Sequence, residues 1–251
     1  MSLRTMPGDA LAAVRFLTRI PVPDTEYDPA ALSRAVVCFP VVGLLVGGLA
    51  VLVAKGLAGH LAQPVVALLV VVFLVLVTGG LHEDGLADAA DGFGGGWTRE
   101  KILLIMRDSR IGSYGALALI FSVGLRVLLL GTMAPGRVAG SLVAGAVLSR
   151  WTVLPLSAWL GSARAEGEGE GARLAGKTPW RMVLAGSFLA FGSVGWILGG
   201  RSWLPILAVV TIAWVTGVFY RTKIGGMSGD CFGATCQLAE LVVYVCGAWT
   251  A

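Results

Sequence analysis

The residues best suited to chemistry are the four carboxylates between Glu83 and Asp91, which directly follow a long apolar run. No Lys or Arg lies among them to neutralise their charge. On an α-helix, at about 100° per residue, Asp84, Asp88 and Asp91 fall within about 60° of one another, whereas Glu83 lies about 100° from Asp84. Carboxylates on one face repel each other unless a cation lies between them, and oxygen ligands of this kind suit Mg²⁺. The spacing therefore predicts a magnesium site made by Asp84, Asp88 and Asp91, with Glu83 as an auxiliary ligand at most.

A simpler interpretation of the same segment stays open. Asp84 caps a helix in that case, and the other acids are solvated. The position of the acids argues against it, because burying a charged residue in a membrane span costs about 2.5 to 3.5 kcal/mol. Gly85, Ala89 and Gly92 also form a stripe of small residues beside the acids, which allows a partner helix or a phosphate group to come close.

A second polar run, from Arg107 to Arg110, precedes another apolar segment. Arg107 and Arg110 suit bidentate contacts to phosphate, and Ser109 lies between them. Asp108 either completes a metal site or orients Arg107. The alternative is that the two arginines only fix the topology of the neighbouring span.

A third polar run contains Ser228, Gly229 and Asp230, preceded by two more glycines. Glycines permit tight backbone turns around an anion, and Asp230 adds another carboxylate. This segment is therefore a candidate substrate-binding loop, within a predicted loop over residues 221–235. A glycine-rich stretch over residues 92–96 is read as a flexible hinge after the acidic helix.

Three charges lie inside apolar runs: Arg126, Arg150 and Glu240. Such charges face the protein interior and pair with an opposite charge. A buried ion pair and a role for Arg150 in binding the substrate are equally consistent with this position.

The composition places these groups in a membrane protein. The chain has 251 residues, of which 56% are hydrophobic and 14% charged, and its mean hydropathy is +0.82. A bilayer core of about 30 Å needs roughly 20 apolar residues per helix. The sequence predicts an all-α, polytopic membrane helical bundle forming one domain over residues 1–251. About seven spans are expected, over residues 35–53, 64–80, 114–133, 138–160, 182–199, 203–220 and 236–251.

Basic residues predict the orientation, because cytoplasmic loops collect Lys and Arg. With the N-terminus inside, the outer segments hold only Lys55, Arg137 and Arg201. The acidic helix then lies at the cytoplasmic face of the cell's inner membrane. The net charge of +4 comes from this asymmetry, so we expect no nucleic-acid partner. We expect no cleavable signal peptide but a short interfacial helix over residues 11–17, stopped by Pro21 and Pro23. The four cysteines show no metal-binding or disulfide pattern.

Four motifs together carry a resemblance to a known family. They are FLTRIPVP at residues 16–23, TGGLHEDGLADAADG at 78–92, IMRDSRIG at 105–112 and GGMSGD at 225–230. In this order the chain resembles the cobalamin synthase family, the adenosylcobinamide-GDP ribazoletransferases. The family pattern of His, any residue, Asp-Gly, Ala-Asp and a later Asp-Gly fits Asp84, Asp88 and Asp91, and leaves the position of Glu83 open.

The resemblance implies a Mg²⁺-dependent transfer of a substituted phosphate group. Adenosylcobinamide-GDP reacts with α-ribazole, or with its 5′-phosphate, to give adenosylcobalamin, or its phosphate, and GMP. In this interpretation Asp91 or Asp108 is the candidate base towards the attacking hydroxyl, and Arg107, Arg110 and Lys177 hold phosphate oxygens. The expected partners are these two substrates and the lipid bilayer, and the sequence leaves open whether the chain forms a homo-oligomer.

The sequence leaves other functions open. A CDP-alcohol phosphotransferase that makes lipids would release CMP, but Asp88 stands where that group's pattern has Arg. An intramembrane prenyltransferase would need two Asp-rich motifs on different helices, and the sequence has one. A divalent-cation transporter would need acids deep within spans and on both sides, yet the outer segments carry none.

Overall fold

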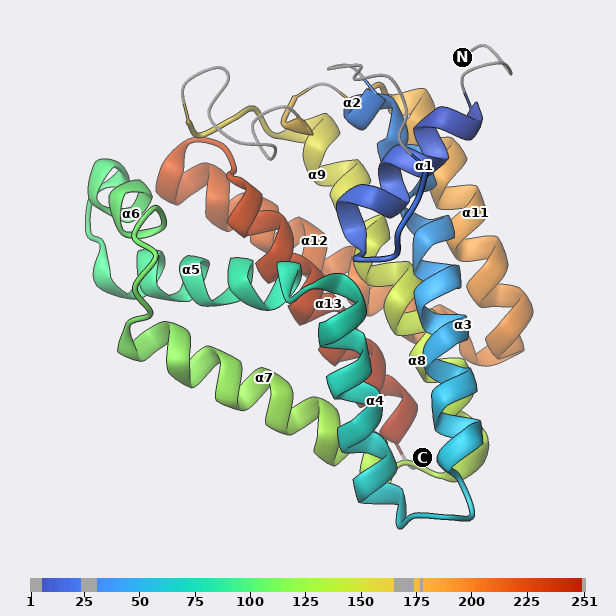
Figure 1. Cartoon of the computed structure of the whole chain (residues 1–251). Coiled ribbons are helices and arrows are strands. Elements are labelled where there is room, and N and C mark those ends of the chain that lie inside the picture. The colour runs from blue at the N-terminus through green and yellow to red at the C-terminus, as the bar shows by residue number, and fades with distance from the viewer. Residues whose placement is uncertain (1–5, 24–30, 165–173, 177, 250–251) are drawn as a thin grey trace.

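The structure is a computed structural model that describes residues 6–23, 31–164, 174–176 and 178–249. This part of the chain is helical, with isolated bridges but no β-strand (Figure 1). The first half contains α1 (Met6–Leu17), α2 (Ala31–Ala35), η1 (Val36–Cys38), α3 (Phe39–Leu57), α4 (Gln63–Thr78), α5 (Leu81–Gly95), α6 (Arg99–Ile105) and α7 (Ser113–Thr132). The second half contains α8 (Pro135–Trp151), α9 (Val153–Trp159), α11 (Trp180–Leu198), η2 (Gly199–Arg201), α12 (Trp203–Ile224) and α13 (Gly229–Ala248).

Within the described ranges, six helical segments are long and apolar enough to cross a membrane, and the bent pair α4 and α5 makes a seventh if it counts as one span. The six are Ala31–Leu57, Ser113–Thr132, Pro135–Trp159, Trp180–Arg201, Trp203–Ile224 and Gly229–Ala248. The prediction of an all-α polytopic bundle is therefore confirmed. The two ends of the chain lie at opposite ends of this bundle (Figure 1), which we call the N-terminal and C-terminal ends.

The bend between α4 and α5 measures 89° and turns the acidic helix across the bundle. Gly79 and Gly80 make this bend, with φ angles of 66° and 70°. Only glycine adopts such left-handed angles without steric cost. Their N–H groups donate to the carbonyl oxygens of Leu76 and Val75, which closes the last turn of α4. The double glycine therefore sets the direction of α5.

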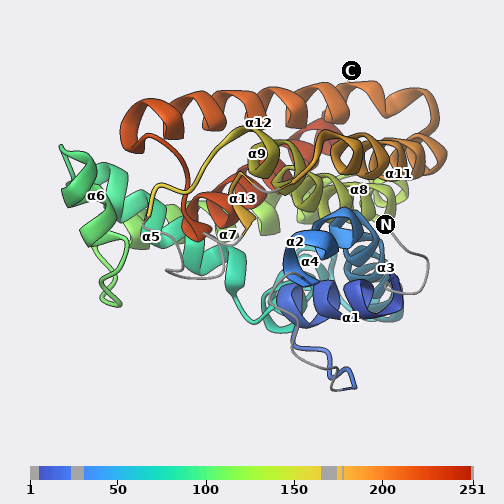
Figure 2. The same ribbon diagram turned by 90° about the horizontal axis from the view of Figure 1, so that it is seen from above.

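Helix α5 packs closely against α13, although the two are far apart in the sequence (Figure 2). A methyl group on Gly85 would lie only 3.1 Å from the Cα atom of Gly233 and from the carbonyl oxygen of Asp230. A side chain on either glycine would have to push the two backbones apart by a few tenths of an ångström, so glycine on both helices favours this close contact. The contact confirms the prediction that the small-residue stripe admits a partner helix.

Two predicted boundaries are wrong. The last membrane helix begins at Gly229 instead of residue 236, so Asp230 lies in its first turn and not in a loop. The predicted hinge over residues 92–96 is helical as far as Gly95. In both places tertiary packing overrides local preference: Gly92 lies against the Met106 side chain and Gly94 against the Tyr114 ring.

We predict that Gly233→Leu separates α5 from α13, because the added side chain has no space at their contact. Overpacking of this kind costs about 1 to 3 kcal/mol. Thermal unfolding in detergent, followed by tryptophan fluorescence, measures the effect. Gly124→Leu is the matched control, because nothing lies within 4 Å of a side chain added there on α7. Equal melting temperatures for the two variants would contradict the role of the glycine contact.

Candidate active site: an acidic cleft between α5 and α13

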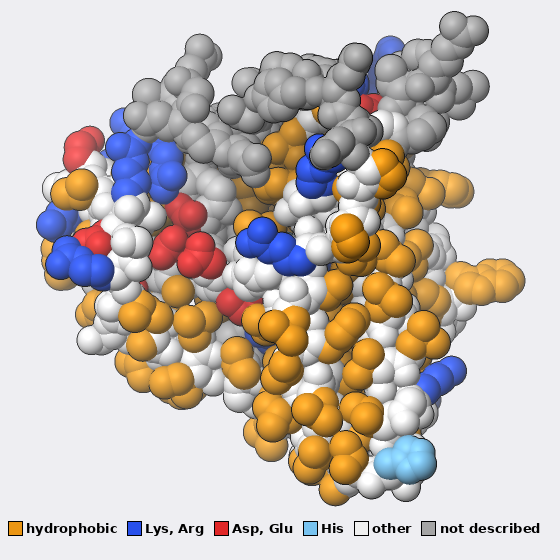
Figure 3. Space-filling view, in the orientation of Figure 1, with side chains coloured by type: hydrophobic (Ala, Val, Ile, Leu, Met, Phe, Trp, Pro, Cys, Tyr) orange, Lys and Arg blue, Asp and Glu red, His pale blue; other side chains and the backbone are white. Residues whose placement is uncertain are grey.

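Three carboxylates form what we call the acid cluster: Asp84 and Asp88 on α5, and Asp230 on α13. Asp84 is exposed and the other two are partly buried. Electrostatic repulsion from Asp230, Asp84 and Asp91 acts on Asp88, while Arg164 attracts it. Acidic side chains gather over α5 in a hollow of the surface, with basic side chains above and beside them (Figure 3). The cluster is therefore an open, negatively charged site beside cationic groups.

Arg164 forms an ion pair with the acid cluster, and no sequence motif marks it as part of the site. Its Nη2 atom lies 2.8 Å from Oδ2 of Asp230, which also accepts a 3.1 Å hydrogen bond from the hydroxyl of Ser228. The backbone before Arg164 is fixed by hydrogen bonds from Ala163 N–H to Met227 and from Met227 N–H to Gly161. No local pattern would have revealed this pairing, because the two segments meet only in the fold.

Asp91 has a different environment from the rest of the acidic helix. Its two carboxylate oxygens accept hydrogen bonds from the N–H groups of Gly112, at 2.7 Å, and Gly115, at 2.9 Å. These groups belong to the first turn of α7, where backbone N–H groups lack helical partners and favour a negative charge. Asp91, predicted as a metal ligand or base, thus anchors α7 to α5 in this structure.

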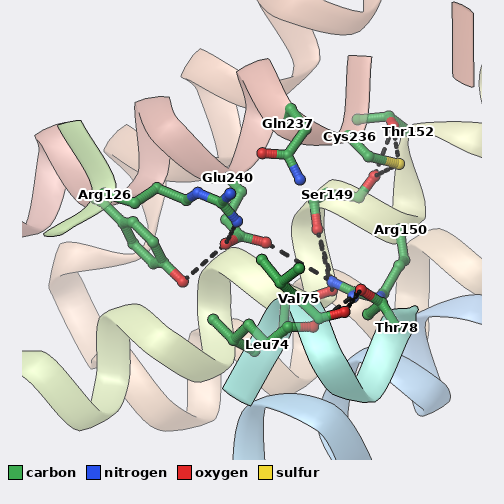
Figure 4. A network of polar contacts seen from close by, with 12 residues as sticks. Leu74, Val75, Thr78, Arg126, Ser149, Arg150, Thr152, Cys236, Gln237 and Glu240 are labelled. Carbon is green, nitrogen blue, oxygen red and sulfur yellow. Dashed lines mark hydrogen bonds and ion pairs between the residues drawn. The ribbon is translucent and has the colours of Figure 1, made fainter. Parts of the chain in front are cut away.

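Glu83 points away from the acid cluster, as its helical position predicts, and is buried between α5, α7 and α13. Its Oε1 atom accepts hydrogen bonds from Arg126, at 2.9 Å, and from Gln237, at 3.1 Å. Arg126 lies 3.5 Å from Glu240, which lies 3.9 Å from Arg150 (Figure 4). We call these two Glu–Arg pairs the buried ion network.

The buried ion network links four helices: α5, α7, α8 and α13. Arg126 was noted in the sequence only as a charge within an apolar run, and Arg150 was a candidate substrate ligand. The structure places Arg150 inside the network, 2% exposed, where it also donates to the carbonyl oxygen of Ala146 and the hydroxyl of Ser149. The network therefore supports the site from the protein interior, and its side chains do not line the cleft.

Three more of the predicted substrate ligands lie on the segment between α6 and α7. Arg107, Ser109 and Arg110 are exposed there. Arg110 and Asp108 form an ion pair of 2.6 Å, and hydrogen bonds from Arg110 lower the pKa of Asp108 from 3.8 to about 2. A carboxylate with so low a pKa is a weak base while this pair persists.

The carboxylates suit a hard cation, but they do not form a closed metal cage. Among the described residues, no group of three or more His, Cys, Asp and Glu side chains is arranged to hold a metal ion. Mg²⁺ is commonly held by one or two carboxylates together with substrate phosphates and water, so an open acid cluster fits it. Gly229 begins α13 beside Asp230, and Lys177 lies outside the described residues.

Fold and site together define a class: a multi-pass helical membrane protein whose acidic cleft, flanked by arginines, suits an anionic substrate bound with a divalent cation. The family model described as cobalamin-5-phosphate synthase matches residues 9–248, and the chain belongs to this family. An adenosylcobinamide-GDP ribazoletransferase from Azorhizobium caulinodans is 43% identical over 93% of this chain and 92% of its own.

Two further relatives with the same name come from Sinorhizobium medicae and Chlorobaculum tepidum. They are 42% and 38% identical, and cover 96% and 97% of this chain and 96% of their own lengths. No solved structure matches the chain.

We predict that Arg126→Leu strongly destabilises the protein, because it leaves Glu83 and Glu240 buried without a balancing charge. Breaking a buried pair in this way costs about 3 to 5 kcal/mol. Adding Glu83→Gln should recover part of the lost melting temperature, since it removes one of the unpaired charges. The exposed Lys223→Gln is the control and should unfold like the wild type.

We predict that Asp91→Asn and Asp84→Asn differ in their effect on folding. Asn has one acceptor oxygen, so Asp91→Asn loses one of the two hydrogen bonds to α7, at a cost of about 1 to 3 kcal/mol. Asp84→Asn removes charge repulsion and should leave the melting temperature equal or higher without divalent cations. Thermal unfolding in EDTA tests both, and a larger loss for Asp84→Asn would contradict the anchoring role of Asp91.

Proposed function

We propose that the protein joins adenosylcobinamide-GDP to α-ribazole, or to α-ribazole 5′-phosphate, and releases GMP. The observation that carries this proposal is the meeting of Asp84, Asp88 and Asp230 beside Arg164, in a chain that matches the cobalamin-5-phosphate synthase family over residues 9–248. The three acids come from the second and fourth of the motifs that resemble the family. The fold thus brings together what the sequence keeps apart.

The reaction is a displacement at phosphorus. A ribose hydroxyl oxygen of the ribazole forms a bond to the phosphorus next to cobinamide, and the bond from that phosphorus to the bridging oxygen breaks. GMP leaves with the electron pair, and the hydroxyl proton passes to a base. Asp108 serves as that base only after Arg110 leaves it for a substrate phosphate, which would bring its pKa back towards 3.8. Asp91 would have to release a backbone N–H group of α7 before it accepts the proton.

We assign Mg²⁺ to the acid cluster, held by Asp84 and Asp88 with Asp230 beside them. When bound, it would neutralise the charge of the pyrophosphate. Arg164, Arg107 and Arg110 would then bind phosphate oxygens, as guanidinium groups do through paired hydrogen bonds. The repulsion within the cluster favours this arrangement, because a cation relieves it.

We also propose that the cleft faces the cytoplasm, in the cell's inner membrane. Among the described Lys and Arg residues, only Lys55, Arg137 and Arg201 lie at the connections from α3 to α4, α7 to α8 and α11 to α12, whereas the connections on the opposite side carry most of the others. Cytoplasmic ends of membrane proteins are enriched in Lys and Arg. A nucleotide-activated substrate would reach the cleft from that side.

Turnover in detergent or vesicles tests the proposal. Purified protein with adenosylcobinamide-GDP, α-ribazole and Mg²⁺ should release GMP and form a cobalamin, and EDTA should abolish both. We predict that Asp84→Asn and Asp88→Asn each lower the rate by more than about 100-fold, because loss of even an outer partner of a metal site costs 10- to 100-fold.

Glu100→Gln is the matched control, since Glu100 is an exposed acid on α6 outside the cluster and should retain turnover. No GMP release by folded wild-type protein would refute the proposed function. Release of CMP from a CDP-alcohol would favour the lipid enzyme instead. Uptake of Mg²⁺ into sealed vesicles without nucleotide turnover would favour a transporter.

A further inference from the structure

A cavity of about 240 Å³, which we call the side cavity, opens next to the acid cluster. Its walls come from α1, the start of α3, α5, α9 and α13, and from Leu174. Its polar lining side chains include Asp84, which is exposed at the cleft, Asp230 and His82. Phe16, Phe39 and Phe232 are among its apolar lining side chains. The cavity therefore joins a charged edge to an apolar interior.

The volume limits what the side cavity can hold. Pockets for drug-sized ligands measure about 300 to 1,000 Å³. A corrin ring or a whole nucleoside diphosphate exceeds the space available, whereas a single small ring system fits. The occupant is therefore one ring system of a substrate, and the side cavity does not enclose the whole of adenosylcobinamide-GDP.

The chemistry of the walls limits the occupant further. The rings of Phe16 and Phe39 stack with centroids 5.8 Å apart and an angle of 21° between them. Val153 and Leu174, both buried, line the same interior. Such a surface favours a flat, apolar ring, since aromatic faces pack well against each other. The two carboxylates at the edge would repel a bare phosphate, but they accept hydrogen bonds from hydroxyl groups.

We propose that the side cavity binds the benzimidazole base of α-ribazole and thereby presents the ribose hydroxyls to the acid cluster. This inference rests on the proposed function, since it assigns one of its two substrates to a place. The base enters the apolar interior, the ribose lies at the edge near Asp84 and Asp230, and adenosylcobinamide-GDP approaches from the open cleft. The N-terminal helix α1 gains a role in substrate choice, because Phe16 belongs to it.

A backbone hydrogen bond fixes the chain close to Phe16. The N–H group of Arg19 donates a 2.7 Å hydrogen bond to the carbonyl oxygen of Val77, near the bend that begins α5. The segment after α1 is thus fixed to the helix that leads into the acidic helix. Phe16 is partly buried, so its substitution changes the cavity more than the core.

Substitutions of opposite size at Phe16 test the inference. Phe16→Ala enlarges the side cavity and Phe16→Trp reduces it. Steady-state kinetics would use α-ribazole and two analogues, one with an unsubstituted benzimidazole and one with a larger naphthimidazole base. We predict that Phe16→Ala raises the KM for α-ribazole about tenfold and shifts preference to the larger base, as lost pocket contacts typically cost at least that much. Phe16→Trp should shift preference to the smaller base.

In both variants the KM for adenosylcobinamide-GDP should stay within about twofold of the wild-type value. Phe121→Ala and Phe121→Trp are the matched controls, because Phe121 is a 61% exposed phenylalanine on α7 outside the cavity. They should leave base preference unchanged. Melting temperatures show whether each variant is folded, and equilibrium binding of 5,6-dimethylbenzimidazole alone gives a readout independent of turnover.

Unchanged base preference in active Phe16 variants would overturn the inference while leaving the proposed function standing. Equal increases in both KM values would also overturn it, since they would show a general defect of the cleft. A phospholipid acyl chain retained by the wild type and lost from Phe16→Trp, with no change in base preference, would assign the cavity to lipid instead. Absence of turnover by the wild type would refute the proposed function itself. Binding of 5,6-dimethylbenzimidazole to the wild type and to the Phe16 variants would then test, without turnover, whether the side cavity binds the base.

Discussion

The buried ion network is the constraint on which the arrangement of the site depends. Glu83, Arg126, Glu240 and Arg150 place two negative and two positive charges between α5, α7, α8 and α13. In an apolar interior each unpaired charge is costly, so the four helices must meet where the charges balance. Tyr244 donates a 3.1 Å hydrogen bond to Glu240, and Ser122 donates to Gln237 at 3.0 Å, which satisfies further acceptors. The network thus holds a polar helix against an otherwise apolar bundle.

The two faces of α5 have different roles: one stabilises the fold and the other forms the candidate site. One face carries Glu83 into the network, while the other carries Asp84 and Asp88 towards the cleft. The glycine contact with α13 brings Asp230 next to these two acids. The fold thus holds like charges together against their mutual repulsion. A site of this kind stores repulsion that a bound cation relieves, because the cation places an opposite charge between the carboxylates.

The sequence predicts the parts of this protein that depend on local pattern. Apolar runs mark the membrane helices, and helical geometry separates Glu83 from its acidic neighbours. The sequence does not reveal that Asp91 binds the N-terminus of α7 or that Arg164 pairs with Asp230, because these contacts join segments that only tertiary packing brings together. The start of α13 was missed for a related reason: its first turns are polar because they face α5 and the cleft, so hydropathy alone does not mark them as helix.

The contact between α5 and α13 also has a consequence for the order in which the protein is made. Helix α5 leaves the ribosome long before α13, and its acidic face is too polar to settle in lipid without partners. The bend at Gly79 and Gly80 turns α5 by 89° from α4, so α4 can enter the membrane before α5 finds its partners. Asp230 and Glu240 join α5 only after α13 is synthesised, so the nascent chain carries an incomplete site until then.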